Sequence, residues 1–334
     1  MRELLPLMAV TMGDPAGVGP EICLDLLAND RLCEICTPVI FGDAGVLGDC
    51  AAKLGLRGAE RVYADGDFGS IHERGVVHID GFDSVGFRPG EVSAATGGAA
   101  YRYVERSIEA ALSGLVAAVV TAPMNKEALR AAGIPFPGHT EIFADRTGSL
   151  RSCMFQYSEE VRASFVTVHV GYSEVAALIT TERILDVIDL TAEAMERIRG
   201  TKPKIVVLGL NPHAGEHGLF GNREEERLIA PAIEAALAKG HLVEGPIPPD
   251  TAFIPAKRRA TDAFVCMYHD QGHIPLKALA FDTAVNTTLG LPIIRTSVDH
   301  GTACDIAWQG LANPSSLFEA VKLAVRLRRS AIES

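Results

Sequence analysis

Residues 262–277 read DAFVCMYHDQGHIPLK, an apolar run that gives way to a polar segment at His269. A short apolar run bounded by polar residues predicts a buried strand. Further runs of this kind alternate with longer amphipathic stretches, and this alternation predicts an α/β fold with largely parallel sheets. The predicted strands are PLMAVTM (6–12), TPVIFGD (37–43), LVAAVVTA (115–122), ASFVTVHV (163–170), KIVVLGL (204–210) and DAFVCMY (262–268), and the predicted helices are 93–114 and 222–240.

The predicted helix over 222–240 carries its own boundary signals. Asn222 is the expected N-cap, and the acidic residues 224–226 complement the positive end of a helix. Gly240 is the expected stop.

His269 and His273 are four residues apart, which is the spacing of two metal ligands on one helical face. Gly272 and Pro275 are expected to interrupt such a helix, because glycine weakens it and proline lacks the N–H donor. If His269 binds a metal, its partner ligands should therefore lie elsewhere in the chain.

Composition limits the classes of function. The chain has 334 residues, 48% apolar and 22% charged, which is long enough for two domains that share one cleft. A net charge of −11 argues against a nucleic-acid or anionic membrane surface, so a small molecule is the expected partner. The N-terminal LLPLMAV does not resemble a signal peptide, and no apolar run reaches the length of a membrane span. We therefore expect a cytoplasmic protein.

Three histidines lie at or just past the ends of predicted strands. His169 ends ASFVTVH, His213 follows KIVVLGL after two residues, and His269 directly follows DAFVCMY. In open α/β sheets, ligands bind outside the carboxyl ends of the strands. Three imidazoles with one open position suit a catalytic Zn²⁺ or a related divalent ion. The alternative for each histidine alone is an ordinary hydrogen-bonded imidazole near a loop.

A second group of polar residues is flanked by glycine, proline or apolar residues, as expected of side chains that point into a site from tight loops. Two cations with hydroxyl and amide donors suit an oxyanion such as phosphate, although solvated surface positions are the alternative. The group comprises His139, Thr140, Lys277, Asn286 and Arg295.

The stretch GDPAGVGPE, residues 13–21, follows the first predicted strand. It lacks the GxGxxG spacing of a dinucleotide fingerprint, and the chain has no P-loop. Gly17 and Gly19 could equally serve only to make a tight turn from strand to helix.

Eight motifs follow one another along the chain: TMGDPAGVGPE, TAPMNKEAL, GHTE, LGLNPHAGEHG, GPIPPDTAF, MYHDQGH, VNTTLGLP and IRTSVDHGTACDIA. Together they resemble the 4-hydroxythreonine-4-phosphate dehydrogenase family over nearly the whole chain. More widely, GDPAGVGPE and HGTACDI are similar to segments of isocitrate and isopropylmalate dehydrogenases. This resemblance implies a two-domain α/β/α fold with the active site in the interdomain cleft. It implies a dinucleotide-side domain of residues 1–128 and 276–334 and a metal, substrate and dimerisation domain of residues 129–275.

The resemblance also assigns roles to residues. It implies that His169, His213 and His269 bind a divalent metal (Zn, Mg, Co or Mn) in a homodimer, with one ligand contributed across the dimer interface. It makes His139, Thr140, Lys277, Asn286 and Arg295 substrate contacts. It also implies NAD or NADP as the cofactor, and the residues expected to face it are Asn286, Leu289, Gly290, Asp299, Gly301 and Asp305.

The implied reaction is oxidation of the 3-hydroxyl of a 4-phosphorylated four-carbon hydroxy acid to a β-keto acid that loses CO₂. The substrates of the family are 4-phosphohydroxy-L-threonine, 4-phospho-D-threonate and 4-phospho-D-erythronate. VHVGYSEV and HDQGHIPLK differ from the vitamin B6 enzyme and resemble the branch that acts on the two D-acids. Asp270 and Lys277 are candidate proton acceptors because they are close to His269 in sequence.

Three alternatives stay open at this point. The resemblance also covers a cis-dihydrodiol dehydrogenase of aromatic degradation, whose substrate carries no phosphate. The same histidines could serve a non-redox metal-dependent hydrolase or aldolase, or a non-catalytic protein with a structural metal.

Overall fold

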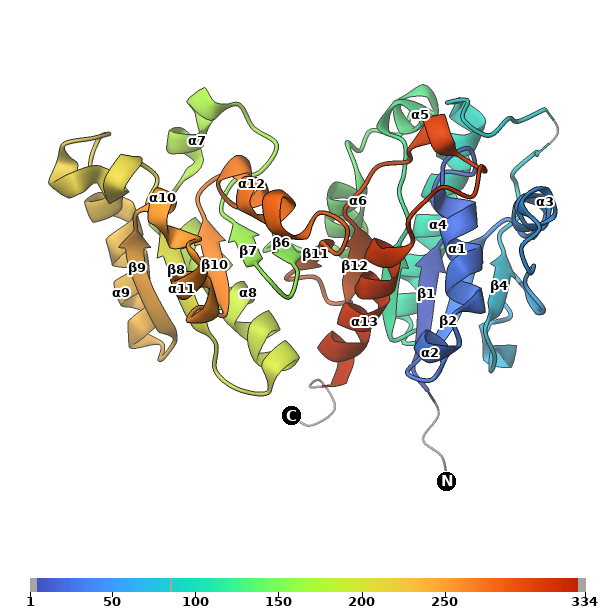
Figure 1. Ribbon diagram of the computed structural model, residues 1–334, viewed down its shortest axis with the longest axis horizontal. Coiled ribbons are helices and arrows are strands. Elements are labelled where there is room, and N and C mark those ends of the chain that lie inside the picture. The colour runs from blue at the N-terminus through green and yellow to red at the C-terminus, as the bar shows by residue number, and fades with distance from the viewer. Residues whose placement is uncertain (1–4, 85, 330–334) are drawn as a thin grey trace. The chain divides into compact units, whose positions relative to one another are not determined.

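The computed structural model of the protein describes residues 5–84 and 86–329 and confirms the α/β class. The chain divides into two compact units. The first unit comprises the residues up to Leu150 together with Leu291–Arg328, and the second unit comprises Arg151–Gly290. Figure 1 labels the helices and strands of both. The functional domains expected from the sequence, residues 1–128 with 276–334 for the dinucleotide and residues 129–275 for the metal, substrate and dimerisation, stay a prediction.

The first unit has a parallel sheet in the order β3-β4-β2-β1-β5-β12. Helix α4 packs along β1, β2 and β5, whereas α1 and α13 lie on the other face in Figure 1. The strands are β1 (Leu7–Thr11), β2 (Thr37–Gly42), β3 (Val62–Ala64), β4 (Gly75–His78), β5 (Ala118–Thr121) and β12 (Arg295–Val298). The helices are α1 (Gly19–Ala28), α2 (Asp30–Cys33), α3 (Ala44–Leu54), η1 (Phe68–Ser70), α4 (Ala94–Leu112), α5 (Lys126–Ala131), α6 (His139–Thr147), η4 (Cys304–Ile306) and α13 (Ser315–Arg329).

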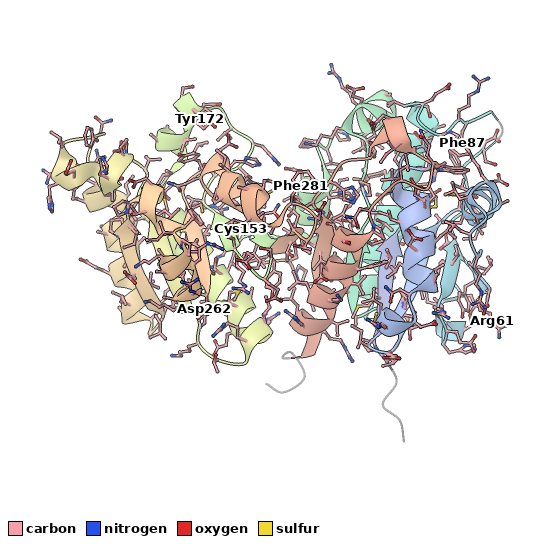
Figure 2. The ribbon with its side chains drawn as sticks, viewed as in Figure 1. Arg61, Phe87, Cys153, Tyr172, Asp262 and Phe281 are labelled. Carbon is pink, nitrogen blue, oxygen red and sulfur yellow. The ribbon has the colours of Figure 1, made fainter. Side chains whose placement is uncertain are left out.

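The second unit has the strand order β11-β6-β7-β10-β8-β9, in which β6 is antiparallel to both of its neighbours and the other pairs are parallel. Asp262, labelled in Figure 2, accepts a hydrogen bond from the Lys204 N–H at the start of β8. The strands are β6 (Cys153–Tyr157), β7 (Arg162–Phe165), β8 (Lys204–Leu208), β9 (Leu242–Ile247), β10 (Ala263–Cys266) and β11 (Val285–Leu289). The helices are α7 (Tyr172–Leu178), α8 (Thr181–Arg199), η2 (Pro212–Gly218), η3 (Glu225–Ile229), α9 (Ala230–Ala238), α10 (Pro249–Ala252), α11 (Pro255–Arg259) and α12 (His269–Ala280).

The six predicted strands are confirmed as β1, β2, β5, β7, β8 and β10, and the helix predicted over 93–114 is confirmed as α4. Ser93 caps α4 by accepting a hydrogen bond from the Thr96 N–H. Among the described helices, none combines the length and the apolar character that crossing a bilayer requires.

The predicted start of the helix over 222–240 is wrong. A π-helical turn, η3, precedes the regular helix α9, and Asn222 does not cap either of them. Instead, the Asn222 N–H donates to the Glu224 carboxylate. Glu224 and Glu225 accept hydrogen bonds from the Asn211 side chain. These tertiary contacts override the local signal for a helix start.

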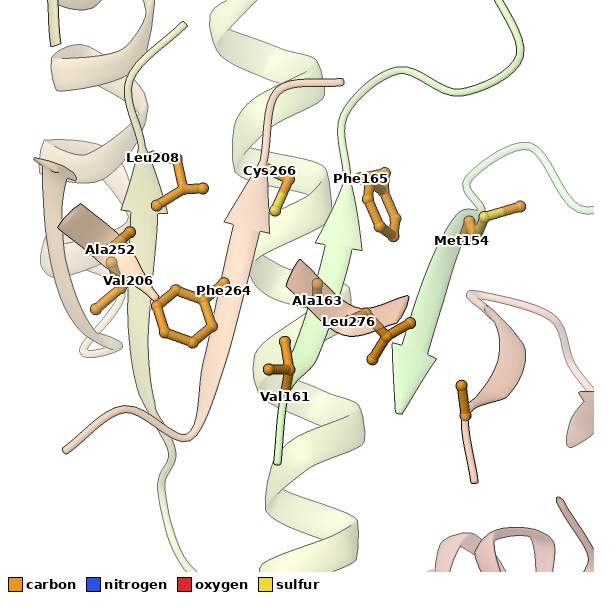
Figure 3. Packing of buried hydrophobic residues seen from close by; sticks show 11 residues of the cluster. Met154, Val161, Ala163, Phe165, Val206, Leu208, Ala252, Phe264, Cys266 and Leu276 are labelled. Carbon is orange, nitrogen blue, oxygen red and sulfur yellow. The ribbon is translucent and has the colours of Figure 1, made fainter. Parts of the chain in front are cut away.

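The prediction that Gly272 and Pro275 interrupt the helix after β10 is also wrong, since α12 contains both residues. A Cβ atom on residue 272 would lie 2.7 Å from Phe165 Cε1 and 2.9 Å from Cys266 Sγ. The glycine therefore allows α12 to approach β7 and β10 closely. Figure 3 shows Phe165 and Cys266 on these strands beside Leu276 of α12. Burial of this helix against the core offsets the weak helix propensity of Gly272 and Pro275.

We predict that Gly272→Ala destabilises the protein by about 1–3 kcal/mol, because the added methyl group overpacks the contact with Phe165 and Cys266. Urea unfolding measures the change. Gly48→Ala is the control, since Gly48 lies in helix α3 and a methyl group added there would meet no atom of the described chain within 4 Å. Equal midpoints for the two variants would contradict the close-packing explanation.

Candidate functional site

A cavity of about 270 Å³ lies where β7 and β10 end. These strands are parallel neighbours, so their carboxyl ends meet at one edge of the sheet. The pairing continues beyond them, because the Thr167 N–H and hydroxyl both donate to the Met267 carbonyl, at 3.2 and 2.8 Å. His169 and His269 both line the cavity, with ring centroids 5.5 Å apart. The structure thus brings together two of the three histidines that the sequence singled out.

Asp270 orients the His269 ring. Its Oδ1 is 2.7 Å from His269 Nδ1, and its Oδ2 accepts a hydrogen bond of 2.5 Å from the Tyr172 hydroxyl. The hydrogen bond from Tyr172 and then the one from His269 lower the pKa of Asp270. The ionised Asp270 carboxylate accepts a hydrogen bond from His269 Nδ1. That nitrogen therefore carries the proton, and the ring lone pair is on Nε2. This is the tautomer that a metal-binding histidine needs.

His273 is held by the protein through both ring nitrogens. Its ring stacks on His269 at 3.8 Å, so both histidines lie on one face of α12, contrary to the sequence prediction. His273 Nδ1 donates to the His269 carbonyl at 3.0 Å, and Nε2 accepts from Gln156 Nε2 at 3.2 Å. No ring lone pair is left for a metal, so the geometry suits a structural role for His273.

His213 lies in an unusual turn after β8. Residues 213–217 all have positive φ, including four that are not glycine, so the backbone makes a left-handed helical turn. Each such residue other than glycine costs about 1–2 kcal/mol, and the turn persists only where surrounding contacts hold it. A Cβ atom at Gly215 would lie 2.5 Å from Glu225 Oε2.

The buried Glu225 carboxylate holds the chain just before His213. Its Oε1 accepts hydrogen bonds from the N–H groups of Leu210 and Asn211, at 2.9 and 2.8 Å. The Asn211 side chain donates to both Glu225 and Glu224, at 3.0 and 2.8 Å. The local sequence pattern had indicated a helix terminus for both acids, so this role was not predicted. The available signal was the turn-rich NPHAGEHG segment, whose backbone N–H groups need acceptors.

His213 does not join the other two histidines in this chain. Its ring is 6.2 Å from the Phe220 ring, and within residues 5–84 and 86–329 no three His, Cys, Asp or Glu side chains are grouped closely enough to hold a metal ion. The donor chemistry fits a divalent metal, because His169 and His269 share a cavity and Asp270 fixes the His269 tautomer. The complete set of three ligands stays a prediction.

Three of the predicted substrate residues lie in the first unit. His139 and Thr140 begin α6, and Arg295 begins β12, where it is 1% exposed. Arg295 Nη2 donates to the Thr121 hydroxyl at 3.0 Å, and its guanidinium lies 5.5 Å from the Phe143 ring centre. Burial lowers the pKa of Arg295, but an arginine still carries its charge at neutral pH.

The imidazole of His139 is buried at Nε2, and that atom has no hydrogen-bond partner among the described residues. Burial lowers the pKa of His139 well below its usual range, and the charge of Arg295 lowers it further. His139 is therefore neutral at physiological pH. A neutral imidazole with one unused nitrogen can exchange a hydrogen bond with a ligand.

The other predicted substrate residues lie in the second unit. Lys277 is half-buried on α12, with Nζ 5.1 Å from the centre of the Phe281 ring. Asn286 lies on β11, and its buried Oδ1 has no hydrogen-bond partner within the described chain. A buried amide oxygen without a partner is a candidate ligand contact.

Comparisons with known proteins identify the family of the chain. The family model described as "Pyridoxal phosphate biosynthetic protein PdxA" matches residues 34–324. The chain belongs to this family. It is 44% identical over 328 residues to 4-hydroxythreonine-4-phosphate dehydrogenase of Desulforapulum autotrophicum, covering 97% of this chain and 96% of the relative. It is 45% identical over 330 residues to D-threonate 4-phosphate dehydrogenase of Salmonella typhimurium, covering 96% and 98%.

A solved structure of a PdxA-family relative supports the fold. The crystal structure of 4-hydroxythreonine-4-phosphate dehydrogenase from Klebsiella pneumoniae superposes with a TM-score of 0.85 at 42% identity. The match covers 97% of this chain and 100% of that one. The family resemblance inferred from the sequence motifs is confirmed.

The residues that the PdxA resemblance assigns to the dinucleotide lie in both units. Leu289 ends β11, and Gly290 follows it with a positive φ, where a Cβ atom would lie 2.1 Å from the Arg151 carbonyl. In the first unit, Gly301 and Asp305 are exposed. The Asp299 N–H donates to Ser316 at the start of α13.

We predict that His139→Asn makes stability less sensitive to acid. Because the pKa of His139 is lower in the folded chain than its unfolded value of about 6.5, the unfolded chain binds the extra proton below pH 6.5. The wild type should therefore lose stability as the pH falls from 6.5, by at most about 1.4 kcal/mol per pH unit from this group. Urea unfolding between pH 7.5 and 5 measures it, and parallel curves for both proteins would contradict the prediction.

Proposed function

We propose that the protein is an NAD(P)-dependent dehydrogenase that oxidises the 3-hydroxyl of a 4-phosphorylated four-carbon hydroxy acid. The product is a β-keto acid that loses CO₂. The observation that carries the proposal is the cavity with an oriented His269 at the strand ends, in a chain about 45% identical over its length to dehydrogenases named for such substrates. These relatives do not favour a dihydrodiol dehydrogenase, a hydrolase or an aldolase.

The proposed metal ligands are His169, His213 and His269. Imidazole ligands suit Zn²⁺ or Co²⁺ better than Mg²⁺, whereas Mn²⁺ accepts both nitrogen and oxygen ligands. A divalent ion bound there would polarise the substrate oxygen and stabilise the negative charge that develops as CO₂ leaves. Asp270 orients the ring of His269. Glu225 holds the backbone just before His213.

A homodimer is part of this proposal. Within the described residues the three histidines are not grouped in one chain, which suits a site completed by a second copy. Apolar side chains near the histidines are exposed, among them Tyr172 at 70% and Leu219 at 69%. A site shared in this way needs an isologous interface and gives two equivalent active sites.

We assign the substrate phosphate to Arg295, with His139 and Thr140 as further proposed contacts. A buried guanidinium is a strong partner for a phosphate dianion, because it forms charge-assisted hydrogen bonds in a poorly solvated environment. His139 is neutral, so it can add a hydrogen bond to the phosphate while Arg295 supplies the positive charge. Lys277 and Asn286 are the proposed contacts from the second unit.

The nicotinamide cofactor supplies the hydride acceptor. Of the two candidate proton acceptors, Asp270 already accepts hydrogen bonds at both oxygens, from His269 and Tyr172. Asp270 and Lys277 both stay candidates for the group that takes the hydroxyl proton while the adjacent C–H is oxidised.

We predict that the metal-loaded protein reduces NAD⁺ or NADP⁺ when a 4-phosphorylated hydroxy acid is added, seen as absorbance at about 340 nm, the band of the reduced nicotinamide. The panel is 4-phosphohydroxy-L-threonine, 4-phospho-D-threonate and 4-phospho-D-erythronate, each with its dephosphorylated counterpart as control. Turnover of a cis-dihydrodiol, or substrate consumption without reduction of either dinucleotide, would refute the proposal.

We also predict that His213→Ala lowers metal affinity at least tenfold, because it removes one of three imidazole ligands. His273→Ala should retain the metal, since both His273 ring nitrogens are bonded to the protein. Isothermal titration with Zn²⁺ or Co²⁺ compares the variants. If His213→Ala bound metal as tightly as the wild type, His213 would not be a ligand.

A further inference from the structure

The GDPAGVGPE turn, residues 13–21, packs against a distant segment of the first unit, residues 301–310. The Glu21 side chain, 2% exposed, accepts hydrogen bonds from the N–H groups of Trp308 and Gly310, at 3.3 and 2.9 Å. We infer that Glu21 is a positioning residue that fixes the 301–310 segment for binding of a nicotinamide dinucleotide. This inference rests on the proposed function, which places Gly301 and Asp305 at the dinucleotide.

The backbones of the two segments also meet directly. The Val18 N–H donates to the Thr302 carbonyl at 3.0 Å, and the Trp308 indole donates to the Pro15 carbonyl at 3.2 Å. A Cβ atom on residue 17 would lie 2.9 Å from both Thr302 Cβ and its carbonyl oxygen. Gly17 is thus required for the close approach of the two segments. The space beside the turn is occupied by Thr302, so the turn is not open to a phosphate group.

The 301–310 segment needs such support because its backbone is strained. Ala303 and Trp308 have φ values of 43° and 58°, in the left-handed region that residues with side chains rarely adopt. Such conformations persist only where neighbouring contacts enforce them, and they concentrate at ligand sites. Glu21 supplies the contact at Trp308.

The segment has one anchored side and one accessible side. Trp308 is 4% exposed and contacts the Phe87 ring edge to face at 5.6 Å. Gly301 and Asp305 are exposed, and a Cβ atom on Gly301 would meet nothing of the described chain within 4 Å. A ligand can therefore reach these two residues while Glu21 fixes the backbone from the buried side, which preorganises the binding surface.

Trp308 is the single tryptophan of the chain, so its fluorescence reports on this anchor. Glu21→Gln keeps the side-chain size but replaces one acceptor oxygen with an amide donor that faces an N–H group. The matched control is Asp25→Asn, which removes the same charge one turn further along α1 and has no hydrogen bond to 301–310 in the described chain. A second variant, which acts on the contact from the other side, is Gly17→Ala, with Gly48→Ala as its control.

The experiment measures NADH binding through energy transfer from Trp308, together with acrylamide quenching of the ligand-free protein. We expect Glu21→Gln, which loses a charge-assisted contact, to raise the Kd for NADH about tenfold and to increase quenching of Trp308. Gly17→Ala should have the same effects, because its methyl group would push the turn away from Thr302. Zn²⁺ affinity and the KM for the phosphorylated substrate should stay at wild-type values. Both controls should match the wild type throughout.

Wild-type NADH affinity in Glu21→Gln and Gly17→Ala would overturn the positioning role alone. An equal loss of NADH and Zn²⁺ binding would also overturn it, because that result indicates a general structural defect. If Glu21→Gln does not fold, Gly17→Ala decides the question by the same criteria. A wild-type protein that binds neither NADH nor NADPH would overturn the proposed function and this inference with it.

Discussion

The close approach of helix α12 to strands β7 and β10 is the constraint on which the candidate site depends. Gly272 makes this approach feasible, because any side chain there would collide with Phe165 and Cys266. The helix begins at His269, so its packing fixes the position of that ring. Gln271 then links the ends of two strands, since it accepts from the Met267 N–H and donates to the Gly209 carbonyl. The position of His269 at the cavity thus depends on the packing of Gly272 against the core, one turn further along α12.

Buried carboxylates hold the strained or irregular backbone in both units. Glu225 accepts the N–H groups before the His213 turn, and Glu21 accepts those of Trp308 and Gly310. Backbone N–H groups outside helices and strands need acceptors when they are buried. A charged acceptor that receives two or three of them compensates for its own desolvation and orders the loop. Asp270 plays a similar role for a side chain, the ring of His269.

The sequence predicted the α/β class, six strands and the place of His169 and His269 because these depend on local apolar runs and on the general rule for strand ends. The continuous α12 could not be predicted, since Gly272 and Pro275 read locally as helix breakers and only the packing partners reveal their tolerance. The stacking of His269 on His273 was missed for the same reason. The role of Glu21 depends on residues nearly 290 positions away, which no local pattern contains.

The central claim is that histidines following separate strands form one divalent-metal site. Anomalous X-ray diffraction from crystals grown with Zn²⁺ tests it most directly. We expect one zinc peak per site, about 2.0–2.1 Å from a ring nitrogen of each of His169, His213 and His269, with His273 outside the coordination sphere. A zinc ion bound through His273, or one without His213 among its ligands, would contradict it.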